Sequence, residues 1–155
     1  MKGALAVLVE NWPSTISFTD LELAVGEKFR AEGAPPPVQT KLREAVFRGV
    51  FGGLIIPHTQ RVTLEKSIPE HPRVTPLTKA QAASGRGISN AYHHPLVPDE
   101  IVRMLLQLAD GSRNVEALAR ELTHEVGVKG KEISPAAVRL LLEELRLNAI
   151  PLDGN

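Results

Sequence analysis

Apolar residues recur at helical spacing in six segments of the chain, and this periodicity constrains the fold more than any other feature. Residues at positions i, i+3, i+4 and i+7 lie on one face of an α-helix, where they can pack against a core. Such stripes occur in the segments 5–12, 18–29, 38–50, 101–108, 115–126 and 138–145. The segment 54–64 is typical of a short strand pair or an extended edge, and the apolar run at 149–152 of an exit strand. The sequence therefore predicts a mainly α fold with short β hairpins.

Particular residues at the segment ends predict where the helices begin and end. Thr19 and Glu22 match a capping box at the start of the second helix. Pro13 closes the first helix, and the glycine pair 52–53 closes the third. The pair Ser134–Pro135 suits the N-cap and first position of the last helix.

The six predicted helices form two groups of three, and an apolar exit segment follows each group. The segments 11–21 and 108–118 have equal length, and each joins the end of one helix to the start of the next. Three helices followed by a strand is the winged-helix plan, so we predict two tandem winged-helix-like three-helix units at 1–64 and 99–155. Between them, residues 65–98 contain five prolines and little periodicity. We predict an extended, proline-rich connector there, with one or two helical turns at 77–87.

Length and composition limit the classes of protein to which the chain can belong. A length of 155 residues fits one domain or two small modules. Eighteen basic and eighteen acidic side chains cancel, so no net charge attracts nucleic acid or an anionic membrane. The absence of cysteine excludes disulfides and thiolate metal sites, and cytoplasm is the expected location. The apolar run near the start is too short to span a membrane, and it lacks a signal-peptide cleavage site.

The winged-helix plan makes nucleic-acid binding one functional hypothesis, because the third helix of such a unit can enter the major groove. In the first unit, the candidate DNA contacts are Lys41, Arg43 and Arg48, which are set against Glu44. In the second unit, the acidic pair 143–144 offsets the arginines of the third helix. Because lysine and arginine contacts to phosphates supply most of the affinity, this pattern leaves DNA binding as an alternative rather than the leading interpretation.

The residues predict no catalytic, cofactor-binding or metal site in this chain. The glycine-containing segments 49–53 and 84–87 lack the preceding strand that a SAM-binding or nucleotide-binding loop requires. His93 and His94 are adjacent, whereas zinc ligands come at positions i and i+4 or from several elements. We therefore expect that the chain itself is not an enzyme, and a free-standing small enzyme is the least favoured interpretation.

Residues 76–122 carry a specific order of short motifs. These are a lysine followed by Ala-Gln-Ala, an Ile-Ser-Asn stretch with a nearby histidine, a Pro-Asp turn, and a leucine run that ends in Asp-Gly. This order resembles the segment downstream of the catalytic domain in bacterial SAM-dependent methyltransferases that carry a methyltransferase regulatory region. Residues 8–21 resemble the same region more loosely. The sequence departs from the family at 91–95, where the family has an arginine before the histidine and an acid after it.

The resemblance implies a non-catalytic accessory or regulatory region of a SAM-dependent methyltransferase, which packs on the catalytic domain or presents its substrate. The implied partners are that catalytic domain, in the same polypeptide or a separate one, and a protein substrate. SAM would be bound by the catalytic domain, and no cofactor is expected in this chain. The alternative is a tandem winged-helix nucleic-acid-binding protein. The candidate interaction residues are Lys79, Arg86, Asn90, Tyr92, His93 and His94.

Overall fold

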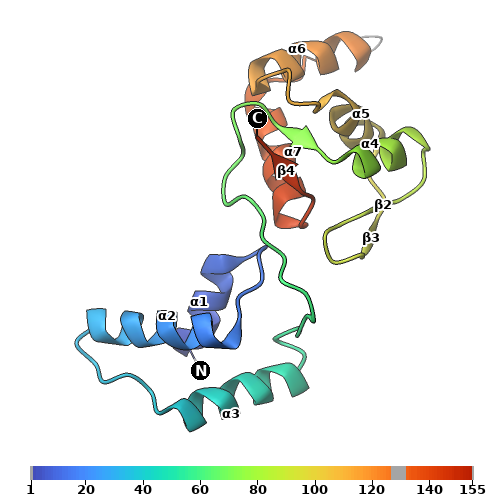
Figure 1. Ribbon diagram of the computed structural model, residues 1–155. Helices are drawn as coiled ribbons and strands as arrows, with labels where there is room; N and C mark the ends of the chain where they lie inside the picture. Colours follow the sequence, from blue (N-terminus) through green and yellow to red (C-terminus); the bar gives the residue numbers. More distant parts are fainter. Residues whose placement is uncertain (1, 127–131, 155) are drawn as a thin grey trace. The chain divides into compact units, whose positions relative to one another are not determined.

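The computed structural model of the chain describes residues 2–126 and 132–154 (Figure 1). The chain divides into two compact units, Met1–Thr63 and Leu64–Asn155. The described residues form seven helices and four strands of two residues each. The prediction of a mainly helical chain with short antiparallel strand pairs is therefore confirmed.

The first unit contains three helices, α1 (Lys2–Asn11), α2 (Phe18–Ala31) and α3 (Gln39–Phe51). Ser17 caps α2, because its hydroxyl accepts a hydrogen bond from the Asp20 amide at 3.1 Å. The predicted cap at Thr19 is therefore wrong by two residues, and Thr19 lies inside the helix. The buried core of this unit consists of Ala4, Val7, Leu21, Val25 and Leu42.

Two further details of the first unit differ from the sequence prediction. In α1 the predicted core stripe included Val9 and Trp12, but both are exposed, and Ala4 and Val7 are buried instead. Residues 4–9 are all apolar, so their pattern did not define one face. Residues 54–64 contain no strand, and the predicted strand pair there is wrong. Instead, backbone and side-chain atoms of Thr15 hold Val62 in place.

The second unit contains four helices and all four strands of the described residues. The helices are α4 (Pro76–Ala83), α5 (Glu100–Leu108), α6 (Val115–Val126) and α7 (Pro135–Leu147). The strands are β1 (Arg73–Val74), β2 (Ile88–Ser89), β3 (Pro95–Leu96) and β4 (Leu152–Asp153). Their shared core is formed by Val74, Ala82, Ile88, Leu105, Leu106, Ala109, Val115, Leu118, Ala119, Leu122, Val138, Leu142, Leu145, Ile150 and Leu152.

The helix patterns of α6 and α7 agree with the sequence prediction, whereas in α5 the predicted core residue Ile101 is exposed and Leu106 is buried. The stripe Val115, Leu118, Ala119 and Leu122 is buried in α6, while the side chain of Val126, predicted for the same face, lies outside the described residues. Ser134 caps α7 and Pro135 occupies its first turn, as predicted. At α5 the N-cap is Asp99, whose carboxylate accepts the Val102 amide at 2.8 Å.

The predicted connector at 65–98 is corrected by this structure. It contributes β1, α4, β2 and β3 to the second unit, and its Val74, Ala82 and Ile88 belong to the unit's core. Thr75 caps α4 and Pro76 occupies the first turn, so one of the prolines starts a helix rather than extending the chain.

Strand β1 lies between two segments from later in the chain. It pairs antiparallel with β4, with Arg73 opposite Asp153 and Val74 opposite Leu152. On its other side Arg73 forms a bridge with Asp110, and the Val74 amide donates to the Ala109 carbonyl at 3.0 Å. The predicted exit strand after the last helix is therefore present, and its partner comes from the predicted connector.

Candidate interaction site

The segment that contains most of the candidate interaction residues is a β hairpin. Strands β2 and β3 pair with Ile88 opposite Leu96 and Ser89 opposite Pro95. The Asn90 amide donates to the His94 carbonyl at 3.1 Å, which closes the turn. Within the turn, the side-chain oxygen of Asn90 accepts the amides of Tyr92 and His94, both at 2.9 Å. One asparagine side chain thus organises the whole tip, as is common in Asx turns.

The same hairpin closes the C-terminal end of α7. The side-chain amide of Asn90 donates to the Asn148 carbonyl at 3.1 Å, and the Ala91 amide donates to the Ala149 carbonyl at 2.9 Å. The last carbonyls of a helix have no partner within the helix, so the hairpin satisfies acceptors that would otherwise need water. The hairpin tip is therefore fixed to α7 on its inner side.

The helix end itself has the geometry of a Schellman motif. The Ile150 amide donates to the Leu145 carbonyl at 3.0 Å, and the Ala149 amide donates to the Arg146 carbonyl at 2.9 Å. Ala149 has a φ of 58°, a conformation that glycine usually supplies at this position. Because Leu145, Ala149 and Ile150 are all buried, packing holds this end in place.

The tip also carries Tyr92, His93 and His94. His93 has a φ of 61°, and the side chains of both histidines are exposed. Tyr92 is half-buried, burial raises the pKa of its phenol, and its ring centroid lies 6.5 Å from that of His94. Among the described residues, no group of three His, Cys, Asp or Glu side chains could hold a metal ion. The tip therefore offers a polar, partly aromatic contact surface.

The other two candidate residues lie on different elements. Lys79 is half-buried on α4, and Arg86 is exposed in the turn between α4 and β2. A neighbour that sequence reasoning missed connects these elements. The side-chain oxygen of Gln81 accepts the Ser89 amide at 3.0 Å, so α4 is joined to the hairpin. The Ala-Gln-Ala motif pointed to this position without revealing its role.

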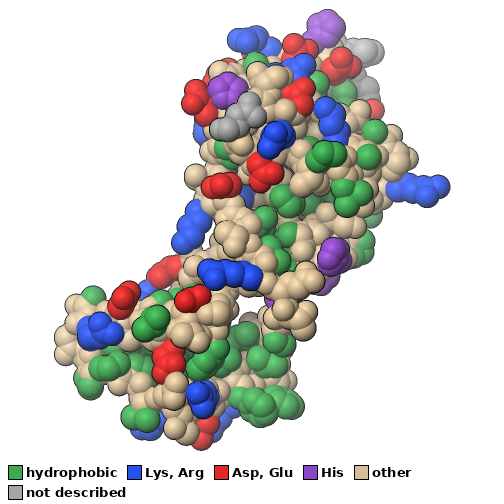
Figure 2. Space-filling view, viewed as in Figure 1, with side chains coloured by type: hydrophobic (Ala, Val, Ile, Leu, Met, Phe, Trp, Pro, Cys, Tyr) green, Lys and Arg blue, Asp and Glu red, His purple; other side chains and the backbone are tan. Residues whose placement is uncertain are grey.

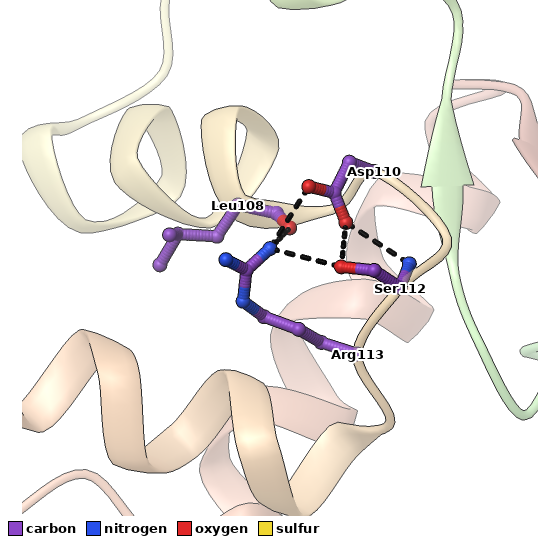
Figure 3. A network of polar contacts seen from close by, with 4 residues as sticks. All are labelled: Leu108, Asp110, Ser112 and Arg113. Atoms are coloured by element: carbon purple, nitrogen blue, oxygen red, sulfur yellow. Dashed lines mark hydrogen bonds and ion pairs between the residues drawn. The ribbon is translucent and has the colours of Figure 1, made fainter.

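The Asp-Gly motif at the end of α5 forms a compact polar turn (Figure 3). The Asp110 carboxylate accepts the hydroxyl and the amide of Ser112 and lies 2.9 Å from the guanidinium of Arg113. Arg113 also donates to the Leu108 carbonyl at 3.3 Å. The hydrogen bonds that Ser112 donates are the main reason why the pKa of Asp110 lies well below its usual range. Arg113 lowers this pKa further. Every group of this cluster has a partner within it, which is typical of a structural turn.

The candidate DNA contacts on α3 do not form one basic face. Lys41, Glu44 and Arg48 follow each other at spacings of three and four, so they share one side of the helix. Arg48 lies 3.7 Å from Glu44, and Arg43 lies elsewhere, with its guanidinium 5.8 Å from the ring centroid of Phe18. All three basic residues are exposed. Acidic and aromatic neighbours thus reduce the positive field that these residues could present.

On α7, the helix predicted to enter a DNA groove, Arg146 is likewise paired. Its Nε donates to the Glu143 carboxylate at 3.0 Å, and this bond lowers the pKa of Glu143 and raises the pKa of Arg146. Because Arg146 is buried, its guanidinium group is held by Glu143 and is not accessible to a phosphate.

The two glycine-containing segments end helices and do not fit a SAM-binding loop. Gly52 and Gly53 close α3, and Gly53 has a φ of 70°. Gly85 follows the end of α4 with the same φ. In the part of the chain that the structure describes, a helix and not a strand leads directly into each segment. A cofactor loop of that kind connects a strand to a helix.

Comparisons with known proteins place this geometry in a family. The model of the family described as "PKMT, C-terminal winged helix domain" matches residues 70–149, just over half of the chain. PKMT stands for protein lysine methyltransferase. No curated protein sequence matches the chain. None of the described helices is both long and apolar enough to cross a membrane.

Two solved structures have a similar fold. They are the structure of PKMT2 from Rickettsia typhi and the structure of that protein in complex with AdoHcy. Each has a TM-score of 0.75 and 16% sequence identity, over 97% of this chain. The chain spans only 33% of the length of the R. typhi protein.

Proposed function

The chain belongs to the family of PKMT C-terminal winged helix domains, and from this we propose that it is a non-catalytic accessory region of a SAM-dependent protein lysine methyltransferase. The observation that carries the proposal is the family match over 70–149. The likeness to R. typhi PKMT2 supports it, because nearly the whole chain resembles one third of a longer protein.

In this proposal the catalytic domain binds SAM and transfers the methyl group, and the present chain contributes protein contacts. It packs on the catalytic domain, in the same polypeptide or a separate one, or it presents a protein substrate. The hairpin tip supports such a role, because Asn90 holds it to α7 while His93 and His94 are exposed and Tyr92 is half-buried. A rigid turn with exposed polar and aromatic groups suits protein recognition.

The charge distribution on α3 and α7 supports nucleic-acid binding less well than protein contacts. A DNA-reading helix requires unpaired lysine and arginine side chains for the phosphates. Arg48 lies beside Glu44 and Arg146 beside Glu143, so the third helix of each predicted unit has an arginine with an acidic neighbour.

The experiment that tests the proposal separates SAM binding from substrate methylation. The isolated chain, titrated with SAM in a calorimeter, is expected to show no saturable heat and to transfer no labelled methyl group to protein. The intact methyltransferase that contains this chain is expected to lose methylation of its protein substrate when residues 1–155 are deleted, while it still binds SAM. Micromolar SAM binding by the isolated chain, or undiminished methylation after the deletion, would contradict the proposal.

A further inference from the structure

Helix α3 exposes an aromatic face that its own unit leaves uncovered. The rings of Phe47 and Phe51 lie one helical turn apart, with centroids separated by 4.5 Å. Their exposed fractions are 63% and 77%, and Leu54, just beyond the helix, is 65% exposed. Figure 2 shows hydrophobic side chains gathered over this end of α3. We call Phe47, Phe51 and Leu54 the α3 aromatic face.

These side chains cannot turn inward, because the other side of α3 is already occupied. Leu42 is buried in the core of the unit, and Val46 packs against that core. At Gly49 the chain after the helix folds back, and a Cβ atom there would lie 2.6 Å from the Ile55 side chain. The Leu54 and Ile55 amides both donate to the Gly49 carbonyl, at 2.8 and 3.1 Å. The fold thus fixes the two phenyl rings on the outside.

An exposed aromatic pair of this kind marks a protein contact. Phenylalanine is enriched in the buried centres of interfaces, and helices bind grooves through apolar anchors spaced three or four residues apart. The charges beside the anchors are mixed: Lys41, Glu44 and Arg48 lie on the adjacent side of the helix, and Arg48 lies 3.7 Å from Glu44. A partner surface with an apolar groove and a margin that carries charges of both signs is complementary to this arrangement.

We propose that the α3 aromatic face docks on the catalytic domain of the methyltransferase, and this inference rests on the proposed function. The R. typhi protein with the same fold is about three times as long as the matched region, so most of that chain is available to cover surfaces of this region. The face lies in residues 1–63, outside the segment 70–149 that the family model matches. The first unit is thereby assigned the docking role.

The test uses the intact methyltransferase with a site for a specific protease introduced just before residue 1. After cleavage, the affinity between the two parts is measured by calorimetry for the wild-type protein and for the variant Phe47→Gln/Phe51→Gln. The matched control is Val9→Gln/Leu23→Gln, which replaces two equally exposed apolar residues on α1 and α2. We expect the α3 variant to weaken the association at least tenfold and the control to leave it unchanged. Circular dichroism checks that both variants keep their helices.

The other outcomes separate this inference from the proposed function. If the two parts do not associate, or if both variants weaken the association equally, the docking role of α3 is wrong while the accessory function stands. If the isolated chain forms a dimer that Phe47→Gln/Phe51→Gln abolishes, a second copy covers the face, and the proposal is overturned. If the cleaved partner does not bind SAM, the proposed function itself fails.

Discussion

The side-chain amide of Asn90 donates to the backbone carbonyl of Asn148, 3.1 Å away, across 58 residues of sequence. The same side chain accepts two amides of its own turn. Asn90 therefore joins the β2–β3 hairpin to the end of α7, and the tip depends on it.

Replacing Asn90 by alanine is expected to destabilise the second unit by about 1–2 kcal/mol, since three backbone groups, one of them part-buried, lose their side-chain partner. Asn90→Asp keeps the two acceptor bonds but loses the donor and places a negative charge at the end of α7, so we expect an intermediate loss. Urea unfolding can be followed through Tyr92, the only tyrosine of the chain, while Trp12, the only tryptophan, reports the first unit. Equal stability of the alanine variant and the wild type would contradict this role.

The backbone of His93, rather than its imidazole, limits which residues the tip accepts. A φ of 61° is unfavourable for a β-branched side chain, so His93→Val is expected to cost about 1–2 kcal/mol. His93→Gly should be tolerated. The matched control is His94→Val, at an exposed neighbour without this backbone conformation, which should change stability by less than about 0.5 kcal/mol. The same urea experiment compares the three variants, and an equal loss at both positions would show that the backbone is not the cause.

The Asp110 turn predicts a pH-dependent contribution to stability. Its pKa is lowered in the folded chain, so the carboxylate stabilises the fold above its unfolded pKa of about 4, and this contribution is lost as the pH falls through the folded pKa. Since the side chain is 36% exposed, we expect Asp110→Ala to cost only about 1 kcal/mol at pH 7. The difference from wild type should shrink below about pH 4. A difference that is constant from pH 7 to pH 3 would exclude the carboxylate as its source.

Limited proteolysis distinguishes a folded 73–96 segment from an extended connector. Lys66 is exposed and lies in neither a helix nor a strand, whereas Arg73 belongs to β1 and Lys79 to α4. We expect trypsin to cut first after Lys66 and later after Arg86, which lies in an exposed turn. Mass spectrometry of a digestion series identifies the order. First cuts after Arg73 or Lys79 would favour the extended connector.

DNA binding provides a direct comparison of the two functional interpretations. We expect residues 1–155 to bind a random duplex only weakly at physiological salt, and Lys41→Ala/Arg43→Ala/Arg48→Ala to retain the wild-type fold. Fluorescence anisotropy across a salt series measures the binding, and circular dichroism controls for folding. If these residues were phosphate contacts, log affinity would fall with log salt by about 0.9 per contact, and the triple variant would lose it. Sub-micromolar binding with that behaviour would favour the nucleic-acid interpretation.

The sequence predicted the helices well, because helix formation depends on local periodicity and capping. The stripe Leu118, Ala119 and Leu122 and the Ser134 cap could be assigned from their neighbours alone. The same reasoning failed in α1, where consecutive apolar residues offered several possible faces.

Features that join distant parts of the chain could not be predicted in this way. The pairing of β1 with β4 involves two residues from each strand, and neither strand has a periodic pattern long enough to detect. The bond from Asn90 to Asn148 depends on the tertiary position of the α7 end. The resemblance to methyltransferases emphasised the hairpin residues, and nothing in the sequence indicated that Phe47 and Phe51 form an exposed pair.

The pairing of β1 with β4 brings the first and last strands of the second unit together, since Arg73 and Asp153 are direct neighbours. A module whose ends meet can be inserted into a surface loop of another protein, or attached at its terminus, without stretching the host chain. The same closeness makes residues 70–154 a natural candidate for circular permutation, with new ends in the exposed turn at 84–87.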